Sequence, residues 1–264
     1  MTVPPMATLQ APAAWATVDF ISDLHLRAEE PATFAAWADY LRSTPADAVF
    51  LLGDVFEVWV GDDVLSDPTS RQTLQDERFE AQCVREMAAA AQRLSLFFMH
   101  GNRDFLVGQA LMTSCQATLL ADPTVLDFGG QRWLLSHGDA LCLDDTEYLQ
   151  FRQQVQQPAW QEAFLAKPLA EREAIARSLR TQSEARKHSG ATYADVDNEA
   201  ARQWLQAAGA HTLIHGHTHR PATHDLGQGL QRVVLSDWDA AASPPRAEVL
   251  RLNASGLQRL PLAV

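Results

Sequence analysis

Short apolar runs alternate along the chain with clusters of Asp, His, Asn and Gly, and this alternation recurs five times. A run of about four to eight apolar or β-branched residues bounded by turn-forming residues is typical of a buried strand. Each run therefore predicts a strand that ends in a polar loop. The five pairs of run and loop are Thr17–Ser22 with Asp23-Leu-His25, Ala48–Leu52 with Gly53-Asp54, Leu94–Met99 with His100-Gly-Asn-Arg-Asp104, Arg132–Ser136 with His137-Gly-Asp139, and His211–Ile214 with His215-Gly-His-Thr-His219.

Helical periodicity fills the intervals between the first strands. Phe34, Trp37 and Leu41 are spaced i, i+3, i+7 after Pro31, which predicts a helix that begins at the proline. A second helix is predicted over Gln75–Arg93. Strands that alternate with helices indicate an α/β core with partly parallel sheets. Because such sheets bind ligands at the carboxyl ends of their strands, we expect the polar loops to gather at one edge.

Antiparallel strands are expected as well. Val125–Phe128 and Arg132–Ser136 flank the pair Gly129-Gly130, which predicts a hairpin. Further strands are predicted towards the C-terminus, at Arg232–Leu235, Ala247–Leu252 and Leu257–Leu262.

The segment from Asp144 to Gly209 has no strand pattern and predicts a helical insertion. We expect helices over Thr146–Gln156, Ala159–Ala166, Ala170–Lys187 and Asn198–Ala208, the last ended by Gly209. The predicted organisation is a core formed by residues 1–143 and 210–264, with residues 144–209 inserted as a cap. Large apolar side chains in the insertion suit either contact with a ligand or simple packing onto the core: Trp160, Phe164, Leu165, Leu169, Ile175 and Leu179.

Charge and composition exclude several classes of protein. The formal net charge is −12, whereas nucleic-acid binders cluster basic residues, so we expect no nucleic-acid partner. Residues 144–190 contain seven basic and seven acidic residues, so the whole of the negative charge falls outside this segment. Cys83, Cys115 and Cys142 are odd in number and lack metal-ligand spacing, which favours reduced thiols in the cytoplasm. Met1–Ala16 lacks the pattern of a secretory signal, and no apolar run approaches the roughly 20 residues of a membrane span.

Taken together, the polar loops offer a ligand set for metal ions. Each motif alone is a weak signal, but all candidate ligands follow strand-like segments and none is a thiolate: Asp23, His25, Asp54, Asn102, His137, His217 and His219. Oxygen and imidazole donors suit octahedral Mn²⁺, Mg²⁺ or Fe²⁺ better than a closed tetrahedral zinc site. Seven protein ligands serve two ions only if one of them bridges, which implies a bridging aspartate and a bridging water. A pair of ions about 3.5–4 Å apart is typical of in-line displacement at phosphorus.

This order of motifs, D-x-H, GD, GN, H and GHxH, resembles the calcineurin-like metallophosphoesterase family. The resemblance implies a β-sandwich flanked by helices. It implies that Asp23, His25 and His219 bind the first ion together with Asp54, and that Asp54 bridges to a second ion completed by Asn102, His137 and His217. His100 and His215 lie outside the ligand positions, and we expect structural or supporting roles for them. Asp104 and Asp139 are expected to orient ligating histidines or to be ordinary loop carboxylates.

Two departures from the general family narrow the expectation. Arg103 replaces the histidine that many members have after Gly-Asn, and an arginine acts as a planar cationic clamp rather than as a proton donor. A proton donor is less necessary when the leaving group is a stable phosphate monoester, which points to a pyrophosphate or another activated diester. The second departure is the helical insertion.

Both departures occur together in the UDP-2,3-diacylglucosamine pyrophosphatase family of lipid A biosynthesis, which the chain resembles from about Thr17 to its C-terminus. The resemblance lies in the stretches Ile21–Leu26, Glu29–Pro31, Leu52–Asp63, His100–Gly108, His137–Asp145, Phe164–Leu169 and Leu213–Pro221. It implies that a metal-bound hydroxide attacks the α-phosphorus of UDP-2,3-bis(3-hydroxyacyl)glucosamine, giving UMP and 2,3-diacylglucosamine 1-phosphate (lipid X).

The same resemblance implies roles for individual residues and a cofactor. The catalytic residues are Asp54, Asn102, Arg103 and His217, and the cofactor is two Mn²⁺ ions per subunit, with Mg²⁺ or Fe²⁺ as alternatives. Substrate contacts fall on Asn102, Arg103, Asp145, Ser183, Lys187 and His217. Arg186 is the alternative to Lys187, because the spacing after Ser183 is one residue shorter than in the family.

The insertion also indicates where the protein works. A basic cluster lies among its apolar residues: Arg177, Arg180, Arg186, Lys187 and His188. Together they suit a cap that encloses acyl chains and meets an anionic lipid surface. We expect a monomeric cytoplasmic protein that attaches peripherally to the cytoplasmic face of the inner membrane.

Two rival functions remain open at this point. One is another metallophosphoesterase activity, on phosphoproteins or dinucleoside polyphosphates, against which Arg103 and the insertion count. The other is a non-enzymatic scaffold, which would have no need to keep seven intact ligands. Comparison of these substrates with UDP-diacylglucosamine tests the first rival, and elemental analysis for bound metal tests the second.

Overall fold

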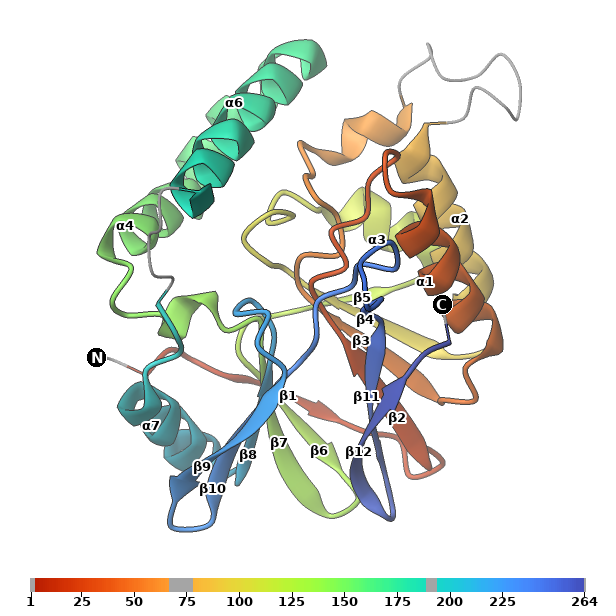
Figure 1. Cartoon of the computed structure of the whole chain (residues 1–264), viewed down its shortest axis with the longest axis vertical. Coiled ribbons are helices and arrows are strands. Elements are labelled where there is room, and N and C mark those ends of the chain that lie inside the picture. Colours follow the sequence, from red (N-terminus) through yellow and green to blue (C-terminus); the bar gives the residue numbers. More distant parts are fainter. Residues whose placement is uncertain (1–2, 67–77, 189–193, 264) are drawn as a thin grey trace.

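Two six-stranded sheets form the centre of the molecule in the computed structural model, which describes residues 3–66, 78–188 and 194–263 (Figure 1). On the helix Leu169–His188, side chains are described as far as Thr181. Helices cover the outer faces of both sheets, and the helices of residues 146–188 lie above the sheets in Figure 1. This mixed architecture agrees with the predicted sandwich flanked by helices.

The first sheet has the order β12-β11-β2-β3-β4-β5. Its strands β2 (Thr17–Ile21), β3 (Ala48–Leu52), β4 (Ser95–Met99) and β5 (Thr118–Leu120) run parallel. The antiparallel pair β11 (Glu248–Asn253) and β12 (Gly256–Pro261) extends the edge beside β2. Every residue of β3 is buried, because this central strand is covered on both faces. All these strands except the short β5 match the strands predicted from the sequence.

The second sheet has the order β1-β6-β7-β8-β10-β9. The predicted hairpin consists of β6 (Thr124–Phe128) and β7 (Gln131–Ser136), and both glycines of its turn have positive φ. Strand β8 (Thr212–His215) runs parallel to β7 and to β10 (Leu230–Val234), which pairs with β9 (Ala222–Gly227). The sequence pattern missed β9 and β1 (Ala7–Gln10), the latter a segment that pairs in parallel with β6.

The core between the sheets comes from alternate side chains of each strand. In β3, Phe50 and its neighbours at i±2 point inwards, while Val49 and Leu51 point to the outer face. Phe50 stacks on Phe97 at 4.7 Å and on Phe20 at 5.1 Å between ring centroids. This aromatic row fixes how the two sheets stack, and hence how their strand ends approach each other.

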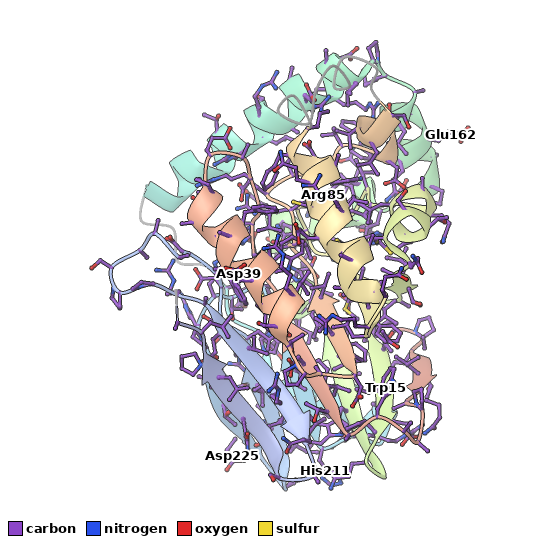
Figure 2. All side chains as sticks on the ribbon, turned by 90° about the vertical axis from the view of Figure 1, so that its right-hand side faces the viewer. Trp15, Asp39, Arg85, Glu162, His211 and Asp225 are labelled. Carbon is purple, nitrogen blue, oxygen red and sulfur yellow. The ribbon has the colours of Figure 1, made fainter. Side chains whose placement is uncertain are left out.

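Helices α1 (Pro31–Ser43), α2 (Phe79–Ala91) and α3 (Gln109–Cys115) pack on the outer face of the first sheet, and α1 and α2 lie side by side (Figure 2). The prediction for α1 is confirmed. For α2 the described part agrees, while residues 75–77 of the predicted helix lie outside the described residues. Helix α7 (Asn198–Ala208) packs Trp204 and Leu205 against the second sheet and ends at Gly209 in the left-handed conformation, as expected.

The insertion forms α4 (Thr146–Val155), α5 (Pro158–Leu165) and α6 (Leu169–His188), close to the predicted bounds. Phe164 is buried in the main core, and Trp160, Leu169 and Ile175 pack against it. Leu165 and Leu179 remain 40% and 42% exposed. Four of the six large apolar residues therefore pack onto the core, and two face solvent. No helix within the described ranges combines the length and apolar composition needed to cross a membrane.

Candidate metal centre

The five polar loops meet at one edge of the sandwich. Strands β2, β3 and β4 are parallel, so Asp23, Asp54 and Asn102 follow them on the same side of the first sheet. Strands β7 and β8 are parallel in the second sheet and deliver His137 and the His215–His219 loop. Backbone hydrogen bonds join neighbouring loops, from Asp23 N to Gly53 O at 3.0 Å and from Gly216 N to His137 O at 2.9 Å.

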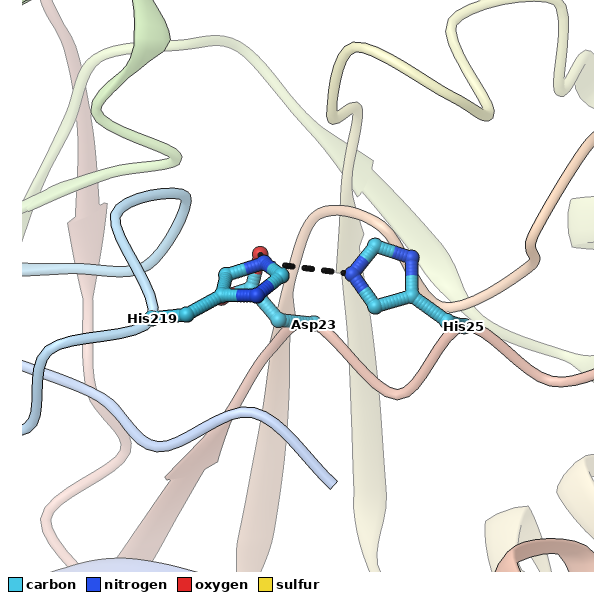
Figure 3. A group of neighbouring side chains, drawn as sticks. All are labelled: Asp23, His25 and His219. Atoms are coloured by element: carbon cyan, nitrogen blue, oxygen red, sulfur yellow. Dashed lines mark hydrogen bonds and ion pairs between the residues drawn. The ribbon is translucent and has the colours of Figure 1, made fainter. Parts of the chain in front are cut away.

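The first group of candidate ligands is Asp23, His25 and His219 (Figure 3). The Nε2 atoms of His25 and His219 lie 3.2 Å apart, and His219 Nε2 lies 3.3 Å from Asp23 Oδ1. His25 and His219 are 194 positions apart in the chain, yet the donor atoms of all three residues lie within 4.8 Å of one another.

The second group forms around Asn102. Its Oδ1 lies 3.1 Å from His137 Nε2 and 2.8 Å from His217 Nδ1. Asp54 Oδ2 lies 3.8 Å from the same His137 nitrogen. Asp23, Asp54 and His137 also form a set whose donor atoms lie within 4.8 Å of one another. Asp23 thus belongs to both three-residue sets of candidate ligands, whereas Asp54 belongs only to the set with His137. The bridging role of Asp54 remains a prediction.

The backbone is shaped to bring these donors close. A side chain at Gly101 would collide with the Asp54 carboxylate and backbone nitrogen, and one at Gly53, where φ is +89°, would collide with the His137 ring. Five of the seven non-glycine residues with positive φ in the described ranges are candidate ligands: Asp23, His25, Asp54, His217 and His219. Left-handed residues concentrate at functional sites because the surrounding structure must hold them there.

Electrostatics in the cluster reflect buried acids facing imidazoles. Burial disfavours ionisation of Asp23, but a hydrogen bond and positive charge from His219, with further charge from His137 and His25, hold its pKa well below the usual range. Burial alone would lower the pKa of His137, yet Asp54, Asp23 and Asp139 raise it to about 9. Burial and the charge of His137 lower the pKa of His217 to about 4.

The donor set fits divalent metal ions. His137 Nδ1 lies 2.9 Å from the Leu52 carbonyl and donates its proton there, which directs Nε2 towards Asp54 and Asn102. A carbonyl that fixes the tautomer in this way is the usual partner of a metal-ligating histidine. The buried carboxylates and ring nitrogens face one another across the same small volume, which is the arrangement that shared cations stabilise.

Arg103 lies beside this cluster, as predicted. Its backbone N–H donates to Asp54 Oδ1 at 2.8 Å, and its Nε lies 3.8 Å from Asp54 Oδ2. Its guanidinium also pairs through Nη1 with Glu57, a buried carboxylate that the sequence analysis missed. The sequence signals for Glu57 are its position three residues after Asp54 and its place in the stretch Leu52–Asp63 that carries the resemblance.

A second missed group covers His217. The Tyr148 ring stacks on the His217 ring with 5.9 Å between ring centroids, and the Tyr148 hydroxyl donates to the Asp139 carboxylate. Arg152 Nε donates to the same carboxylate at 2.7 Å. Asp139 therefore supports α4 over the site and does not accept a histidine N–H, contrary to one of the two expectations for it.

Asp104 likewise differs from the orienting role considered for it. It is buried, and it accepts the backbone N–H groups of Gly101 and Val55, each at 2.8 Å. This carboxylate holds together the loops that carry Asn102 and Asp54. His100 bonds the Val107 carbonyl at 2.7 Å, and the buried His215 bonds the Gly216 carbonyl at 2.9 Å, in line with the structural roles expected for both.

Of the substrate contacts expected in the insertion, the structure describes the side chain of Asp145 but not those of Ser183 and Lys187. Asp145 is the N-cap residue of α4 and accepts the Tyr148 N–H at 3.1 Å. Ser183, Arg186, Lys187 and His188 lie on α6 beyond the described side chains. Arg180, one turn before Ser183, reaches Glu57 with its Nε at 3.1 Å from Oε1, so α6 does extend to the edge of the site.

Known proteins resemble this chain along most of its length. Residues 16–221 match the family model described as calcineurin-like phosphoesterase. The UDP-2,3-diacylglucosamine hydrolase of Chromobacterium violaceum is 45% identical over 254 residues, which cover 93% of this chain and 98% of that protein. Proteins with the same name from Ralstonia nicotianae and Pseudomonas aeruginosa are 45% and 40% identical, covering 89% and 93% of this chain and 89% and 98% of their own lengths.

Proposed function

Because the chain belongs to the calcineurin-like phosphoesterase family and, within it, to the UDP-2,3-diacylglucosamine hydrolases, we propose that it hydrolyses the pyrophosphate bond of UDP-2,3-diacylglucosamine. The products are UMP and 2,3-diacylglucosamine 1-phosphate, an intermediate of lipid A biosynthesis. The observation that carries this proposal is the convergence of all seven candidate ligands beside Arg103 in a chain so similar to these relatives.

We propose that two divalent ions, Mn²⁺ in the first place, bind the cluster. Asp23, His25 and His219 hold one ion with Asp54, and Asn102, His137 and His217 complete the other with Asp54 as the bridge. Such an ion pair supplies a bound water of lowered pKa and neutralises charge that develops on the phosphate.

The chain's own residues orient the substrate. Arg103 is fixed to Asp54 through its backbone and side chain, so its fork is held beside the phosphate position. A guanidinium binds two phosphate oxygens at once, which a point charge does not. Asn102 and His217 contact the substrate from the opposite loops, and Asp145, Ser183 and Lys187, or Arg186 in its place, contact it from the insertion.

The test is a product assay on UDP-2,3-diacylglucosamine in which UMP and the diacylglucosamine 1-phosphate are separated and quantified. Stoichiometric release of both products supports the proposal. Release of inorganic phosphate, or faster hydrolysis of a phosphoprotein or of diadenosine tetraphosphate, would contradict it and support the rival phosphoesterase activities.

We also propose that the insertion meets the cytoplasmic face of an anionic inner membrane. Leu165 and Leu179 are exposed apolar groups on the insertion, and Arg177, 70% exposed, is a basic residue on the same helix as Leu179. Peripheral proteins bind anionic lipid surfaces by burying apolar side chains in the membrane interface and by pairing basic residues with the lipid headgroups. Flotation with vesicles of anionic and of neutral phospholipid measures it, and equal recovery in the unbound fraction for both would contradict it.

A further inference from the structure

Glu57 lies on the loop after β3, where this loop meets the loops that carry His25 and Arg103. Its backbone N–H donates to the Leu26 carbonyl at 3.1 Å, and the neighbouring Phe56 forms a β-bridge with Leu26. Two residues further on, the Trp59 N–H donates to the Arg103 carbonyl at 3.2 Å. The loop that carries Glu57 is thus tied through its backbone to the loops that carry His25 and Arg103, and the residue is only 8% exposed.

The carboxylate of Glu57 divides its two oxygens between two kinds of partner. Oε2 lies 3.3 Å from Nδ1 of the candidate ligand His25. Oε1 pairs with Arg103 Nη1 and with Arg180 Nε, the latter at 3.1 Å. One buried side chain thereby touches a candidate metal ligand, the phosphate clamp and the insertion helix α6. A carboxylate that only stabilised the fold would have no need of these three partners.

Each contact has a definite chemical consequence. His25 turns Nε2 towards the candidate metal position, so its Nδ1 carries the proton and needs an acceptor. The buried Nδ1 meets the full geometry of a hydrogen bond with no residue in the described ranges, and Glu57 is the carboxylate that lies within ion-pair distance of it, at 3.3 Å. A carboxylate in this position orients a metal-bound imidazole and raises its basicity.

Arg103 and Arg180 both form ion pairs with the Glu57 carboxylate. The Glu57 carboxylate pairs with two guanidinium groups beside a site that we propose binds a pyrophosphate. Planar guanidinium groups must be held in one orientation to bind phosphate oxygens in pairs. Glu57 supplies that restraint through Oε1, which pairs with both guanidinium groups.

We propose that Glu57 is a positioning residue that orients His25 for metal binding and, through its other oxygen, holds Arg103 and Arg180 in the geometry that the reaction needs. The metal-binding half of this proposal is independent of the substrate, and the arginine half rests on the proposed function.

The metal-binding half is tested with metal-free protein titrated calorimetrically with Mn²⁺. Glu57→Ala removes the acceptor for His25 and should weaken binding at one of the two sites by about 10–100-fold, the effect usual for the partner of a metal ligand. Glu57→Gln keeps an oxygen acceptor and should fall between Glu57→Ala and the parent.

The arginine half is tested kinetically on Glu57→Gln at saturating Mn²⁺. The neutral amide removes one negative charge beside both guanidinium groups, so the anionic ground state should bind at least as well and KM should not rise. The arginines lose their strong charged partner, so kcat should fall about tenfold through poorer orientation. A merely structural carboxylate would not separate kcat from KM in this way.

Glu86→Ala is the matched control. Glu86 lies on α2 and pairs with Arg42 of α1 at 2.7 Å. Its side chain is 11% exposed, compared with 10% for the side chain of Glu57. This variant should keep the parent's Mn²⁺ affinity, kcat and KM within about threefold, because a surface-helix ion pair contributes little beyond local stability.

The proposal requires both changes at Glu57. Parent-like Mn²⁺ affinity in Glu57→Ala overturns it, and so does a Glu57→Gln enzyme with unchanged kcat or with a raised KM alone. Bis(p-nitrophenyl) phosphate is assayed beside UDP-2,3-diacylglucosamine. A parent protein that hydrolyses only the former would refute the substrate assignment, and the Glu57 comparison would then be read with that compound.

Discussion

Residues at the candidate metal centre adopt backbone conformations that most side chains avoid. Asp23, Asp54 and His219 each have φ of +53°. Such conformations cost roughly 1–3 kcal/mol each and persist only where the surroundings impose them. Here backbone hydrogen bonds from Asp23 to Gly53 and from His25 to Asp54 impose them, each at 3.0 Å. The donors are thereby positioned before any ion arrives.

Removal of Asp54 should release both metal ions together, because we expect its carboxylate to bridge them. Elemental analysis of purified Asp54→Ala should find less than one ion per chain, and chelation of the parent should abolish turnover, with Mn²⁺ restoring it better than Zn²⁺. Asp23→Ala is the informative comparison, since Asp23 belongs to both donor groups. If Asp54→Ala keeps two ions, the two-metal assignment fails. If Asp54→Ala keeps one ion and Asp23→Ala none, the bridge is Asp23.

Arg103→Lys should lose most of the hydrolytic rate although the charge is retained. A lysine cannot reproduce the paired contact of a guanidinium with phosphate or with Glu57. Loss of one preorganised electrostatic contact lowers kcat about 10²–10³-fold. Steady-state kinetics on UDP-2,3-diacylglucosamine measure this, with Arg42→Lys on α1 as the control. Rates within a few-fold of the parent for both Arg103→Lys and Arg103→Ala would show that Arg103 is no clamp.

Metal binding should release a proton from His137 at neutral pH. The acidic neighbours raise the pKa of His137 to about 9 in the metal-free protein, so below pH 9 the ring carries a proton that a metal ligand must lose. Affinity for Mn²⁺ should therefore rise with pH up to about 9, by as much as about tenfold per unit for this group. Calorimetry in buffers of different ionisation enthalpy counts the protons, and a binding heat independent of buffer would contradict the expectation.

Among the elements, α6 is anchored firmly at its start and lightly further along. Arg172 is buried there; it donates to the Lys167 carbonyl at 3.0 Å, to Asp63 Oδ1 at 2.9 Å and to the Val60 carbonyl. Two turns later, Arg180 pairs with Glu57. The helix thus fastens the insertion to the core loop after β3, and it carries the exposed Leu179 between these two attachments.

Leu179→Asp should abolish the advantage that acyl chains give a substrate. Each buried methylene contributes about 0.8 kcal/mol, so two fatty chains in contact with the insertion supply much of the affinity. The exposure of Leu179 means that the charge should not unfold the protein. The measurement compares kcat/KM for diacylated and deacylated UDP-glucosamine on parent and variant, with melting temperature and metal content as controls. Equal rates on both substrates for the parent would show that the helices serve only to pack the fold.

At the scale of the whole molecule, the candidate site depends on how the two sheets stack on each other. The first sheet supplies Asp23, Asp54 and Asn102, and the second supplies His137, His217 and His219. The two halves meet only because the aromatic row of Phe20, Phe50 and Phe97 and the side chains opposite it fill the space between the sheets. Site geometry and core packing are therefore coupled.

Phe50→Ala should destabilise the whole fold by about 3–5 kcal/mol, the usual effect of removing a fully buried aromatic side chain. Denaturant unfolding of the metal-free protein measures it, so that metal binding does not mask the change. Leu165→Ala, at a 40% exposed position, should stay within about 1 kcal/mol of the parent. A Phe50→Ala protein as stable as the parent would mean that the inter-sheet core repacks freely.

Local sequence pattern was sufficient for most of the elements and for the candidate ligands. The apolar runs before Asp23, Asp54, Asn102 and His137 became strands with their polar ends at one edge, because alternation and burial are encoded in a few neighbouring residues. The helices of the insertion were predicted to within a few residues for the same reason, since capping residues and periodicity are local signals.

Tertiary structure alone decided which distant segments meet. Strand β1 forms only because it pairs with β6, more than a hundred residues away, and its own short pattern carries no sign of that partner. The same holds for Glu57, whose three partners come from the β2 loop, the β4 loop and α6. The sequence by itself determined the metal-binding chemistry, because donor types and their order are written in the motifs. The fold determined which carboxylates lie in the candidate metal cluster and which support other side chains, because that choice depends on distances between loops that no local pattern contains.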